Sequence, residues 1–377
     1  MSRNKVDVSK LNSTEKHEFE MTTFFAPKKA KSRKIAAAYR RIGDEQSAKA
    51  IYDCGSFLDF GHFSDDTNRL IHANFCKHRM CPMCAWRRSL KNFSHLSDVF
   101  SVLEETHEFV FLTLTEKNCT ADELPERLSA LCRQFVNLLR RDCMSVFDGA
   151  FRSVEVTYDG EKYITRDMYN RKKAYYDGLG LSVGDENPTY DTYHPHLHTI
   201  LSAPKGSYFG GSAYMPFKEW LALWREIGGY DYDPSIRVNR IGNKTIYNPK
   251  SKRYVTVSLK KALKEVSKYS VKDEDFLKSD LPQEKADEVL KVLSDALHRR
   301  RLIAYYGIMK DLHKEFAVKK KINDDDLVSV TDEESNGAEL EYRFAYRWQK
   351  DHKTGEFRYV NIDGNAPLGL PQPPPSA

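Results

Sequence analysis

Three histidines alternate with other residues in the segment His194-Pro-His196-Leu-His198. Successive side chains of a β-strand point to opposite faces of the sheet, so His196 and His198 would share one face. Two imidazoles at this spacing can bind one divalent cation, but a neighbouring strand must then supply a further ligand. The segment therefore predicts paired strands with a metal-binding face, because packing alone explains three alternating histidines poorly.

A third ligand is available on another segment with the character of a strand. Glu155 lies within Phe151–Thr157, and in an extended chain its side chain points away from those of Val154 and Val156. The carboxylate can therefore lie on the accessible face of the sheet. The predicted ligands of the divalent cation are His196, His198 and Glu155.

The surrounding segments predict an α+β fold, with one sheet and helices packed on a face. Residues 109–115 form a continuous run of β-formers, which is typical of a strand buried on both faces. Residues 159–193 are polar, rich in tyrosine and punctuated by glycine, so we expect an excursion or a mobile loop there. Helices are expected at 32–52, 122–144, 217–227, 257–272 and 283–320, and further strands at 196–201, 339–348 and 356–362.

Composition excludes several classes of protein. Of the 377 residues, 40% are hydrophobic, which is ample for a core, and the net charge of +5 is only mildly basic. A nucleic-acid site must therefore come from local clusters of charge. No stretch approaches the roughly 18–20 apolar residues that span a bilayer, and residues 1–10 lack the apolar core of a secretion signal. We expect a cytoplasmic protein with no membrane partner.

Three of the seven cysteines lie within the segment 76–84, and a fourth lies upstream, after a predicted helix. An odd number of cysteines in a cytoplasmic chain indicates metal rather than disulfides. Four thiolates can close a tetrahedral zinc site, and a C-x-x-C turn commonly supplies two of them. The predicted ligands of a structural Zn²⁺ are Cys54, Cys76, Cys81 and Cys84.

Alternatives stay open for this cluster. A histidine could replace Cys54 as the fourth ligand, and the candidates are His62, His72 and His78. The cysteines could also be reduced and buried without metal. Basic residues around the knuckle would lower the thiol pKa values and could contact phosphates. They are Arg79, Arg87 and Arg88.

A third constellation is expected on the helix at 257–272. Glu265 and Tyr269 are four residues apart, and Tyr269 and Lys272 are three apart, so the side chains would share one stripe. Tyrosine is a poor nucleophile at its free pKa of roughly 10 and needs activation. A metal-polarised phosphate and a nearby lysine would supply the field. Taken alone, this helix is better explained if Tyr269 is a half-buried aromatic with a structural role. Together with the histidine strand, a catalytic role for Tyr269 becomes the better explanation.

These motifs resemble, in their order, those of the replication initiator proteins of small bacterial rolling-circle plasmids, within the superfamily of histidine-hydrophobic-histidine (HUH) endonucleases. The resemblance covers roughly residues 50–310, and the cysteine pattern with Ala85-Trp-Arg-Arg88 is also similar to this family. The three motifs are Phe111-Leu-Thr-Leu-Thr-Glu-Lys-Asn118, His194-Pro-His-Leu-His198 and Glu265-Val-Ser-Lys-Tyr269-Ser-Val-Lys272.

The resemblance implies an antiparallel HUH sheet flanked by helices, with an N-terminal helical and zinc-knuckle region and a small C-terminal extension. It implies that Tyr269 attacks a phosphodiester at the plasmid's double-strand origin, which leaves a 5′-phosphotyrosyl link and a 3′-hydroxyl primer. Mg²⁺ or Mn²⁺ on the histidines would polarise the phosphate, and Lys272 would assist. Glu265 would direct the water that ends the cycle, with Asp273 as its rival.

The implied partners are plasmid origin DNA, presented as a hairpin with a single-stranded nick site, and a host helicase; a homodimer is left open. The Tyr305–Tyr306 pair, which we place in a basic helix, resembles the pair of two-tyrosine relatives and is a weaker candidate for a second nucleophile. Residues in or beside the motifs that we expect to contact DNA are Arg79, Arg87, Arg88, Asn118 and Lys268.

Two competing classes remain. One is another HUH nuclease, a transposase or a relaxase. The other is a non-catalytic zinc DNA-binding repressor, which leaves the histidine strand and the tyrosine helix unexplained. We divide the chain into a flexible basic N-terminus (1–30), a helix plus zinc-binding region (31–105), the HUH nuclease domain (106–280), a basic helical segment (281–321), an acidic linker (322–338), a C-terminal β-hairpin (339–365) and a disordered tail (366–377).

Overall fold

The structure, a computed structural model, describes residues 11–242, 247–248, 253–254, 256–268, 271, 281–319, 326–328, 338–351 and 355–362. The chain divides into two compact units, one formed by Met1–Ser94 with Ile322–Ala377 and the other by His95–Lys321. Among the described helices, none is long and apolar enough to cross a membrane.

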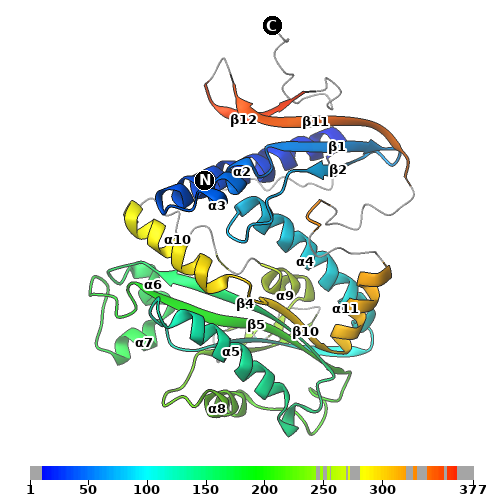
Figure 1. Ribbon diagram of the computed structural model, residues 1–377. Helices are drawn as coiled ribbons and strands as arrows, with labels where there is room; N and C mark the ends of the chain where they lie inside the picture. Colours follow the sequence, from blue (N-terminus) through cyan, green and yellow to red (C-terminus); the bar gives the residue numbers. More distant parts are fainter. Residues whose placement is uncertain are drawn as a thin grey trace. The chain divides into compact units, whose positions relative to one another are not determined.

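The unit formed by His95–Lys321 is organised around a six-stranded sheet (Figure 1). Its neighbouring strands are antiparallel, except for β6 and β9, which are parallel. The predicted α+β class with an antiparallel sheet is confirmed. In sheet order the strands are β10 (Ile303–Gly307), β4 (Gly149–Asp159), β5 (Thr192–Pro204), β3 (His107–Thr115), β6 (Ile236–Ile241) and β9 (Thr256–Val257).

Helices cover this sheet because each has one apolar stripe to bury. In α5 the residues at helical spacing, from Leu124 to Leu138, are buried. Gly229 ends α8 in a left-handed conformation (φ 62°), which glycine adopts without a Cβ clash. A separate short ladder pairs β7 (Tyr247–Asn248) with β8 (Arg253–Tyr254). The helical elements are α4 (Pro82–Leu103), which enters this unit from the other, α5 (Leu124–Leu139), η3 (Asp142–Met144), α8 (Phe217–Gly228), α9 (Leu259–Val266), α10 (Gln283–Leu297) and α11 (Ile308–Lys319).

Strand register determines which face of the sheet each side chain occupies, because opposite residues of paired strands point the same way. Tyr306 pairs with Ala150, and Tyr305 pairs with Phe151. The ring of Tyr306 contacts Phe135 of α5 at 5.7 Å between centroids, so α5 covers the Tyr306 face. Glu155 lies four residues after Phe151 on β4 and therefore points away from α5.

The expected excursion between β4 and β5 is a small folded insertion rather than a mobile loop. It contains α6 (Arg166–Arg171) and α7 (Lys173–Gly178), and Ile164, Met168 and Tyr176 form a core of its own. At its base Asp159 accepts hydrogen bonds from Asn187 and Thr189. The insertion is therefore anchored on the sheet next to the strand that carries the histidines.

The prediction of a helix over residues 283–320 is wrong in its middle. The chain forms α10, then the edge strand β10, and then α11. The strand pairs with β4 over five residues, from Ile303 to Gly307. The basic segment at 281–321 is therefore not wholly helical, and Tyr305 and Tyr306 lie on the sheet instead of on a helix.

The other unit contains a four-stranded antiparallel sheet. The two C-terminal strands were expected as a separate hairpin, but the first of them pairs with β1 along its length. Of the predicted linker and tail, the structure describes only residues 326–328 and 338, and 366–377 lie outside the described residues. In sheet order the strands are β12 (Phe357–Asn361), β11 (Leu340–Lys350), β1 (Phe57–Phe63) and β2 (Thr67–Ala73).

The expectation of a flexible segment up to residue 30 is wrong for residues 13–30, which are helical. His17 is buried, and its ring meets Phe60 edge-on at 4.6 Å, so this segment packs on the sheet. The single helix expected at 32–52 is broken at Gly43, whose φ of 85° ends it. The elements are α1 (Ser13–Glu20), the π-helix η2 (Met21–Phe25), α2 (Ala26–Arg41) and α3 (Glu45–Asp53).

Candidate metal centres and catalytic residues

The paired strands β4 and β5 bring together the three residues predicted to hold a divalent cation. Glu155 lies directly opposite His196 in the register, and His198 is two residues further along β5. Oε2 of Glu155 is 3.0 Å from Nε2 of His198 and 3.5 Å from Nε2 of His196. One ligand atom from each residue lies within 4.8 Å of the others. We refer to these three residues as the triad.

Hydrogen bonds behind the imidazoles orient the triad. Nδ1 of His196 lies 3.2 Å from the carbonyl oxygen of His194, and Nδ1 of His198 lies 3.3 Å from Oγ1 of Thr113. Such partners of Nδ1 fix the ring so that Nε2 faces the site. Sequence analysis missed Thr113, although a polar residue within the apolar run at 109–115 was a signal for it.

The triad is almost sealed from solvent, with 5–8% of each residue exposed. Burial raises the pKa of Glu155, but hydrogen bonds with His196 and His198 lower it more, so that pKa lies well below its usual range. Burial, with the charge of His196, lowers the pKa of the neighbouring His194 to about 4. An ionised carboxylate with two imidazoles is a donor set that binds divalent metal ions and leaves coordination positions open.

The predicted nucleophile helix ends earlier than expected. α9 ends at Val266, and Ser267 is its C-cap. The helical spacing that was expected to place Glu265 and Tyr269 on one stripe therefore does not apply. Glu265 is half-buried, and its Oε2 lies 2.5 Å from Nζ of Lys268. Tyr269, Lys272 and Asp273 lie outside the described residues.

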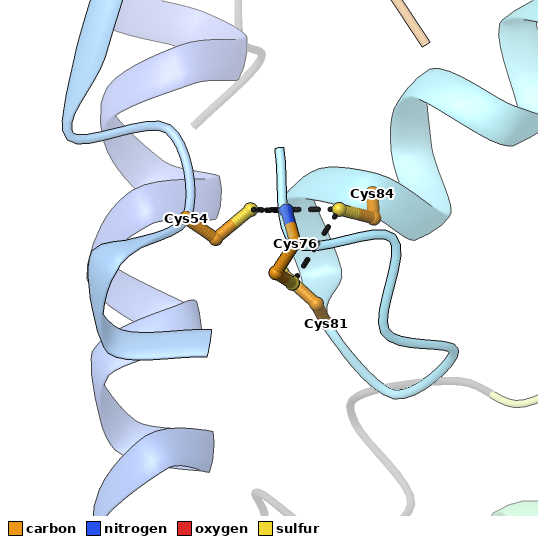
Figure 2. Close-up of side chains that lie close together, drawn as sticks. All are labelled: Cys54, Cys76, Cys81 and Cys84. Atoms are coloured by element: carbon orange, nitrogen blue, oxygen red, sulfur yellow. Dashed lines mark hydrogen bonds between the residues drawn. The ribbon is translucent and has the colours of Figure 1, made fainter. Parts of the chain in front are cut away.

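Four cysteines from separate segments converge in the other unit (Figure 2). Cys54 follows α3, Cys76 follows β2, Cys81 precedes α4 and Cys84 lies in its first turn. The four Sγ atoms lie within 4.8 Å of one another, and Cys54 is 3.4 Å from Cys84. This group, called the cysteine cluster below, can hold a metal ion. The candidate replacements for Cys54 lie outside it: His62, His72 and His78.

Backbone amides support the sulfur atoms of the cluster. The N–H of Lys77 donates to Sγ of Cys84 (3.2 Å), and the N–H of His78 donates to Sγ of Cys76 (3.4 Å). Lys77 adopts a left-handed conformation (φ 60°), which turns the chain sharply between the ligands. N–H donors of this kind stabilise negative charge on sulfur, and the thiolate is the metal-binding form of cysteine. In a cluster without metal, hydrogen bonds with the other cysteines and burial nevertheless raise the pKa of Cys84 well above its ordinary value.

A buried lysine lies beside the cluster, and sequence analysis did not single it out for this role. Lys29 is 1% exposed, and its Nζ donates to the carbonyl oxygens of Tyr52 (2.6 Å) and Cys54 (2.7 Å). Burial lowers its pKa to about 8, while the nearby thiols raise it. Burial also raises the pKa of Cys81, but hydrogen bonds from the other cysteines, Cys54 first, bring it well below its ordinary value.

The arginines near the knuckle have different surroundings. Arg87 is buried, and it donates to the carbonyl oxygens of Leu327 (2.9 Å) and Val328. This placement speaks against the predicted phosphate contact, because the guanidinium is already engaged with the C-terminal segment. Arg88 donates to the carbonyl oxygen of Lys77 and is partly exposed, as is Arg79.

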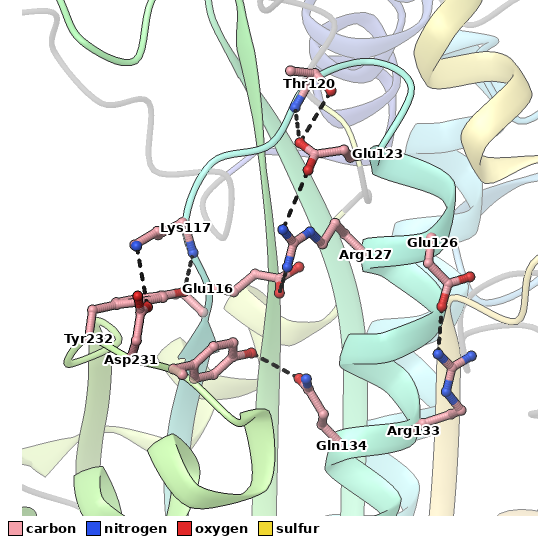
Figure 3. Close-up of polar contacts among 12 residues, drawn as sticks. Glu116, Lys117, Thr120, Glu123, Glu126, Arg127, Arg133, Gln134, Asp231 and Tyr232 are labelled. Carbon is pink, nitrogen blue, oxygen red and sulfur yellow. Dashed lines mark hydrogen bonds and ion pairs between the residues drawn. The ribbon is translucent and has the colours of Figure 1, made fainter.

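The turn after β3 carries the predicted DNA contact Asn118. Its Nδ2 donates to Oγ1 of Thr192 (2.8 Å), at the start of the histidine strand. The N–H of Lys117 donates to the hydroxyl of Tyr232 (2.8 Å), and the Lys117 ammonium lies 4.0 Å from that ring. The turn is therefore tied to β5 through Asn118 and to the loop before β6 through Lys117; Figure 3 shows the second of these ties.

Glu116, next to this turn, is a buried carboxylate that sequence analysis did not assign a role. It is 4% exposed, and the guanidinium of Arg127, shared with Glu123, lies 3.8 Å away (Figure 3). Burial raises the pKa of Glu116 to about 7, although Arg127 and the hydroxyl of Tyr230 lower it. That hydroxyl donates to Gln134 (2.9 Å).

The two adjacent tyrosines of β10 occupy opposite faces. Tyr305 lies on the same face as the triad, and its ring stacks on His313 at 4.1 Å. The hydroxyl of Tyr306, on the α5 face, accepts a hydrogen bond from Nε of Arg152. Tyr305 is therefore the one of the pair whose side chain shares a face with the triad.

Comparison with known proteins identifies relatives along most of the chain. Residues 67–359 match the family described as "Replication protein", and these residues include the triad and three of the four cysteines of the cluster. "Protein rep" of Bacillus amyloliquefaciens is 32% identical over 319 residues, which cover 80% of this chain and 84% of that protein. "Protein rep" of Lactiplantibacillus plantarum is 31% identical over 310 residues, which cover 81% and 86%. No solved structure matches the chain.

Proposed function

Because the chain belongs to the "Replication protein" family, we propose that it initiates rolling-circle replication of a bacterial plasmid by nicking one strand at the plasmid origin. The observation that carries this proposal is the triad, whose three ligand atoms converge on one sheet face. A replication protein that only binds DNA has no need of such a site. A nicking enzyme needs it, because a metal ion there stabilises charge on the scissile phosphate.

The triad fits Mg²⁺ or Mn²⁺, since one carboxylate and two neutral imidazoles are donors that divalent ions accept. When bound there, such an ion supplies polarisation of the phosphate. Thr113 and the carbonyl of His194 hold the two imidazoles in place for it. The burial of the triad keeps the local dielectric low, which strengthens these electrostatic effects.

Tyr269 is the proposed nucleophile. Its phenolic oxygen gives up its proton and forms a bond to phosphorus, while the bond between phosphorus and the 3′ oxygen breaks. The 3′ oxygen takes up one proton, so the net result is transfer of the phenolic proton to the 3′ oxygen, which leaves as a hydroxyl. The products are a 5′-phosphotyrosyl link and a 3′-hydroxyl primer. Lys272 would stabilise the attacking oxygen by its charge. No nucleotide cofactor is needed, because the phosphotyrosyl bond retains the energy for rejoining.

Glu265 is the proposed base for the water that ends the cycle. The ion pair with Lys268 holds this half-buried carboxylate near the end of α9, four residues before the nucleophile in sequence. Asp273 is the rival. In Glu265→Ala we expect nicking and the covalent link to persist while released circles decline. If Glu265→Ala releases circles normally and Asp273→Ala does not, the role belongs to Asp273.

The cysteine cluster is proposed to hold a structural Zn²⁺. Four thiols with N–H···S support fit a closed tetrahedral site, in which no position is left for a substrate. The proposed contacts to origin DNA are Arg79, Arg88, Asn118 and Lys268, and Arg87 is no longer among them. A host helicase would unwind the duplex from the nick, in the bacterial cytoplasm.

A plasmid that carries the gene tests this proposal. Purified protein is incubated with the supercoiled plasmid and Mn²⁺, with and without EDTA. We expect a nick with a covalent 5′ adduct in Mn²⁺, and DNA binding without cutting in EDTA. Binding without cutting in both conditions would favour the alternative of a non-catalytic zinc repressor. A nick that forms equally in EDTA would refute the metal-dependent mechanism.

A further inference from the structure

The unit that contains the triad has a pocket at the opposite end of the sheet. Its volume is about 570 Å³, within the range of roughly 300–1,000 Å³ that small-molecule sites occupy. Its wall is formed by the beginning of β3, the residues that follow β5, the end of β6 and Leu259 at the beginning of α9. Among the described residues, neither the triad nor Glu265 lines it, and the proposed function assigns this pocket no role.

An aromatic ring and a guanidinium are stacked at this pocket. Both Phe209 and Arg240 line it, and the Arg240 guanidinium carbon lies 4.5 Å from the centroid of the Phe209 ring. Neither side chain is fully buried. Unpaired bases stack on both kinds of plane, on aromatic rings and on guanidinium groups.

The loop that carries Phe209 is fixed before any ligand arrives. Oε1 of Glu108, on β3, accepts hydrogen bonds from the backbone N–H groups of Tyr208 (2.8 Å) and Phe209 (2.9 Å). Gly206 and Gly210 also line the pocket, so that part of the wall is backbone. A loop whose backbone is already held costs less entropy to order on binding, which favours a site over an incidental hollow.

The charges at the pocket favour a base over a phosphate. Its lining carries two cations, Lys205 and Arg240, and two carboxylates, Glu104 and Glu108. These charges balance, and a phosphate site would need an excess of cations. A nucleobase is neutral and has both hydrogen-bond donors and acceptors on its edges, which match such a mixed lining.

We propose that this pocket binds one unpaired nucleobase of the single-stranded origin DNA, stacked on Phe209 and Arg240, at a fixed distance from the scissile phosphate. The proposal rests on the proposed function, because that function brings single-stranded DNA to this unit. In the register of β3 and β5, Thr115 is opposite His196 and Phe109 is opposite Ser202. Six residues of strand separate the two ends, or about 20 Å. Arg240 pairs with Val110 and therefore points to the α5 face, opposite to the triad. A DNA strand that reaches both sites must pass around the sheet, so it needs more than the roughly six nucleotides that span about 20 Å at a rise of about 3.4 Å each.

The test combines a protein variant with an abasic scan of the DNA. Single-stranded oligonucleotides that tile the origin are prepared with one abasic site at each position in turn, and their Kd values are measured by fluorescence anisotropy in EDTA. For the unmodified protein we expect one position whose abasic form binds roughly 5- to 150-fold more weakly, as loss of one stacked base predicts. In Phe209→Ala the intact strand should bind more weakly by a similar factor, and that position should lose its abasic penalty.

Phe217→Ala is the matched control, because Phe217 is 48% exposed at the start of α8 and does not line the pocket. It should leave both the affinity and the abasic profile unchanged. If Phe209→Ala loses thermal stability, Arg240→Gln replaces it and should also reduce the penalty at that position. Unchanged binding by the variants, or an abasic profile that does not depend on Phe209, would overturn the pocket proposal.

The abasic scan and the plasmid nicking assay, performed on the same protein, distinguish failure of this proposal from failure of the proposed function. A covalent adduct on the plasmid with no Phe209-dependent abasic position would refute the pocket alone. A Phe209-dependent position without any nick or adduct would refute the nicking function and leave the pocket as a binding site for single-stranded DNA. Equal weakening at every position would mean that Phe209 contacts the backbone, which also contradicts the proposal.

Discussion

The triad and the cysteine cluster are both candidate metal sites, but they are constructed differently. The triad comes from two adjacent strands, and the pairing of Glu155 with His196 fixes it. The cluster is assembled from four positions around helix and strand ends, and backbone N–H groups turned toward sulfur support it. The three ligands of the triad leave coordination positions of a metal ion open, whereas four thiols occupy every position of a tetrahedral site.

We propose that the two sites differ in function, with an exchangeable ion at the triad and a permanent ion at the cluster. Open positions let a phosphate reach the ion, and hard donors such as a carboxylate suit ions that exchange readily. Thiolates bind zinc so firmly that binding and folding become one event. The predictions below test whether the two sites separate in this way.

The largest effect is expected in the triad. His196→Ala or His198→Ala should reduce nicking by at least about 1,000-fold, since loss of phosphate polarisation costs several kcal/mol. Zinc content should stay at the level of the unaltered protein, as measured by metal analysis of the purified variants. A variant that nicks at the original rate would show that the metal site lies elsewhere.

The reverse pattern is expected in the cysteine cluster. Cys81→Ser or Cys84→Ser should lose zinc and lower the thermal midpoint, because the metal links segments on either side of the β1–β2 hairpin. Cys143→Ser is the matched control, since Cys143 is exposed and lies outside the cluster. Calorimetry and metal analysis measure the thermal midpoint and the zinc content. If both quantities are unchanged in the two cluster variants, the cluster is four reduced thiols without metal.

A smaller effect should come from the partner of His198. Thr113→Val removes the hydroxyl that lies 3.3 Å from Nδ1 of the imidazole, and loss of such a partner typically weakens metal binding about 10- to 100-fold. Thr199→Val is the control, because its buried hydroxyl has no hydrogen-bond partner in the described part of the chain. The concentration of Mn²⁺ that gives half-maximal nicking should rise only in the first variant.

The last of these tests concerns pH, stability and the buried carboxylate Glu116, and it leaves nicking chemistry aside. Its folded-state pKa is raised from 4.5 to about 7. Its contribution to stability is therefore fully present below about pH 4.5 and is lost as the pH rises through 7, by up to about 3 kcal/mol. Glu116→Gln should flatten the stability profile over this window in chemical denaturation. Glu126→Gln, an exposed carboxylate on α5, should leave the slope unchanged.

Sequence patterns predicted the triad because the direction of each of its side chains follows from alternation within a single strand. Alternation along a strand places His196 and His198 on one face, and Glu155 follows from the same period. The clustering of the four cysteines could also be predicted, since three of them are close in sequence. Strand β10, which carries Tyr305 and Tyr306, could not be predicted from the sequence, because the helical pattern of its flanking segments continues across it. Its strand conformation depends on pairing with β4, which lies far away in sequence.

The same reason explains the other differences. β11 pairs with β1 across 277 to 290 residues of sequence, and no local pattern reports such a contact. Residues 13–30 are polar on average, yet His17 and Phe25 pack against Phe60 of the sheet and order the segment. The early end of α9 at Val266 also escaped prediction, because no glycine or proline marks it. Local periodicity therefore predicted which residues face a site, whereas long-range pairing decided where elements begin and end.

The attachment site of the DNA tests the account most directly. The plasmid is nicked in Mn²⁺, the covalent complex is digested, and the peptide that carries a nucleotide is sequenced by mass spectrometry. We predict a phosphotyrosyl link at Tyr269, and a Tyr269→Phe variant that binds the origin but forms no adduct. An adduct at Tyr305, whose side chain shares the sheet face of the triad, or one that persists in Tyr269→Phe, would contradict this assignment.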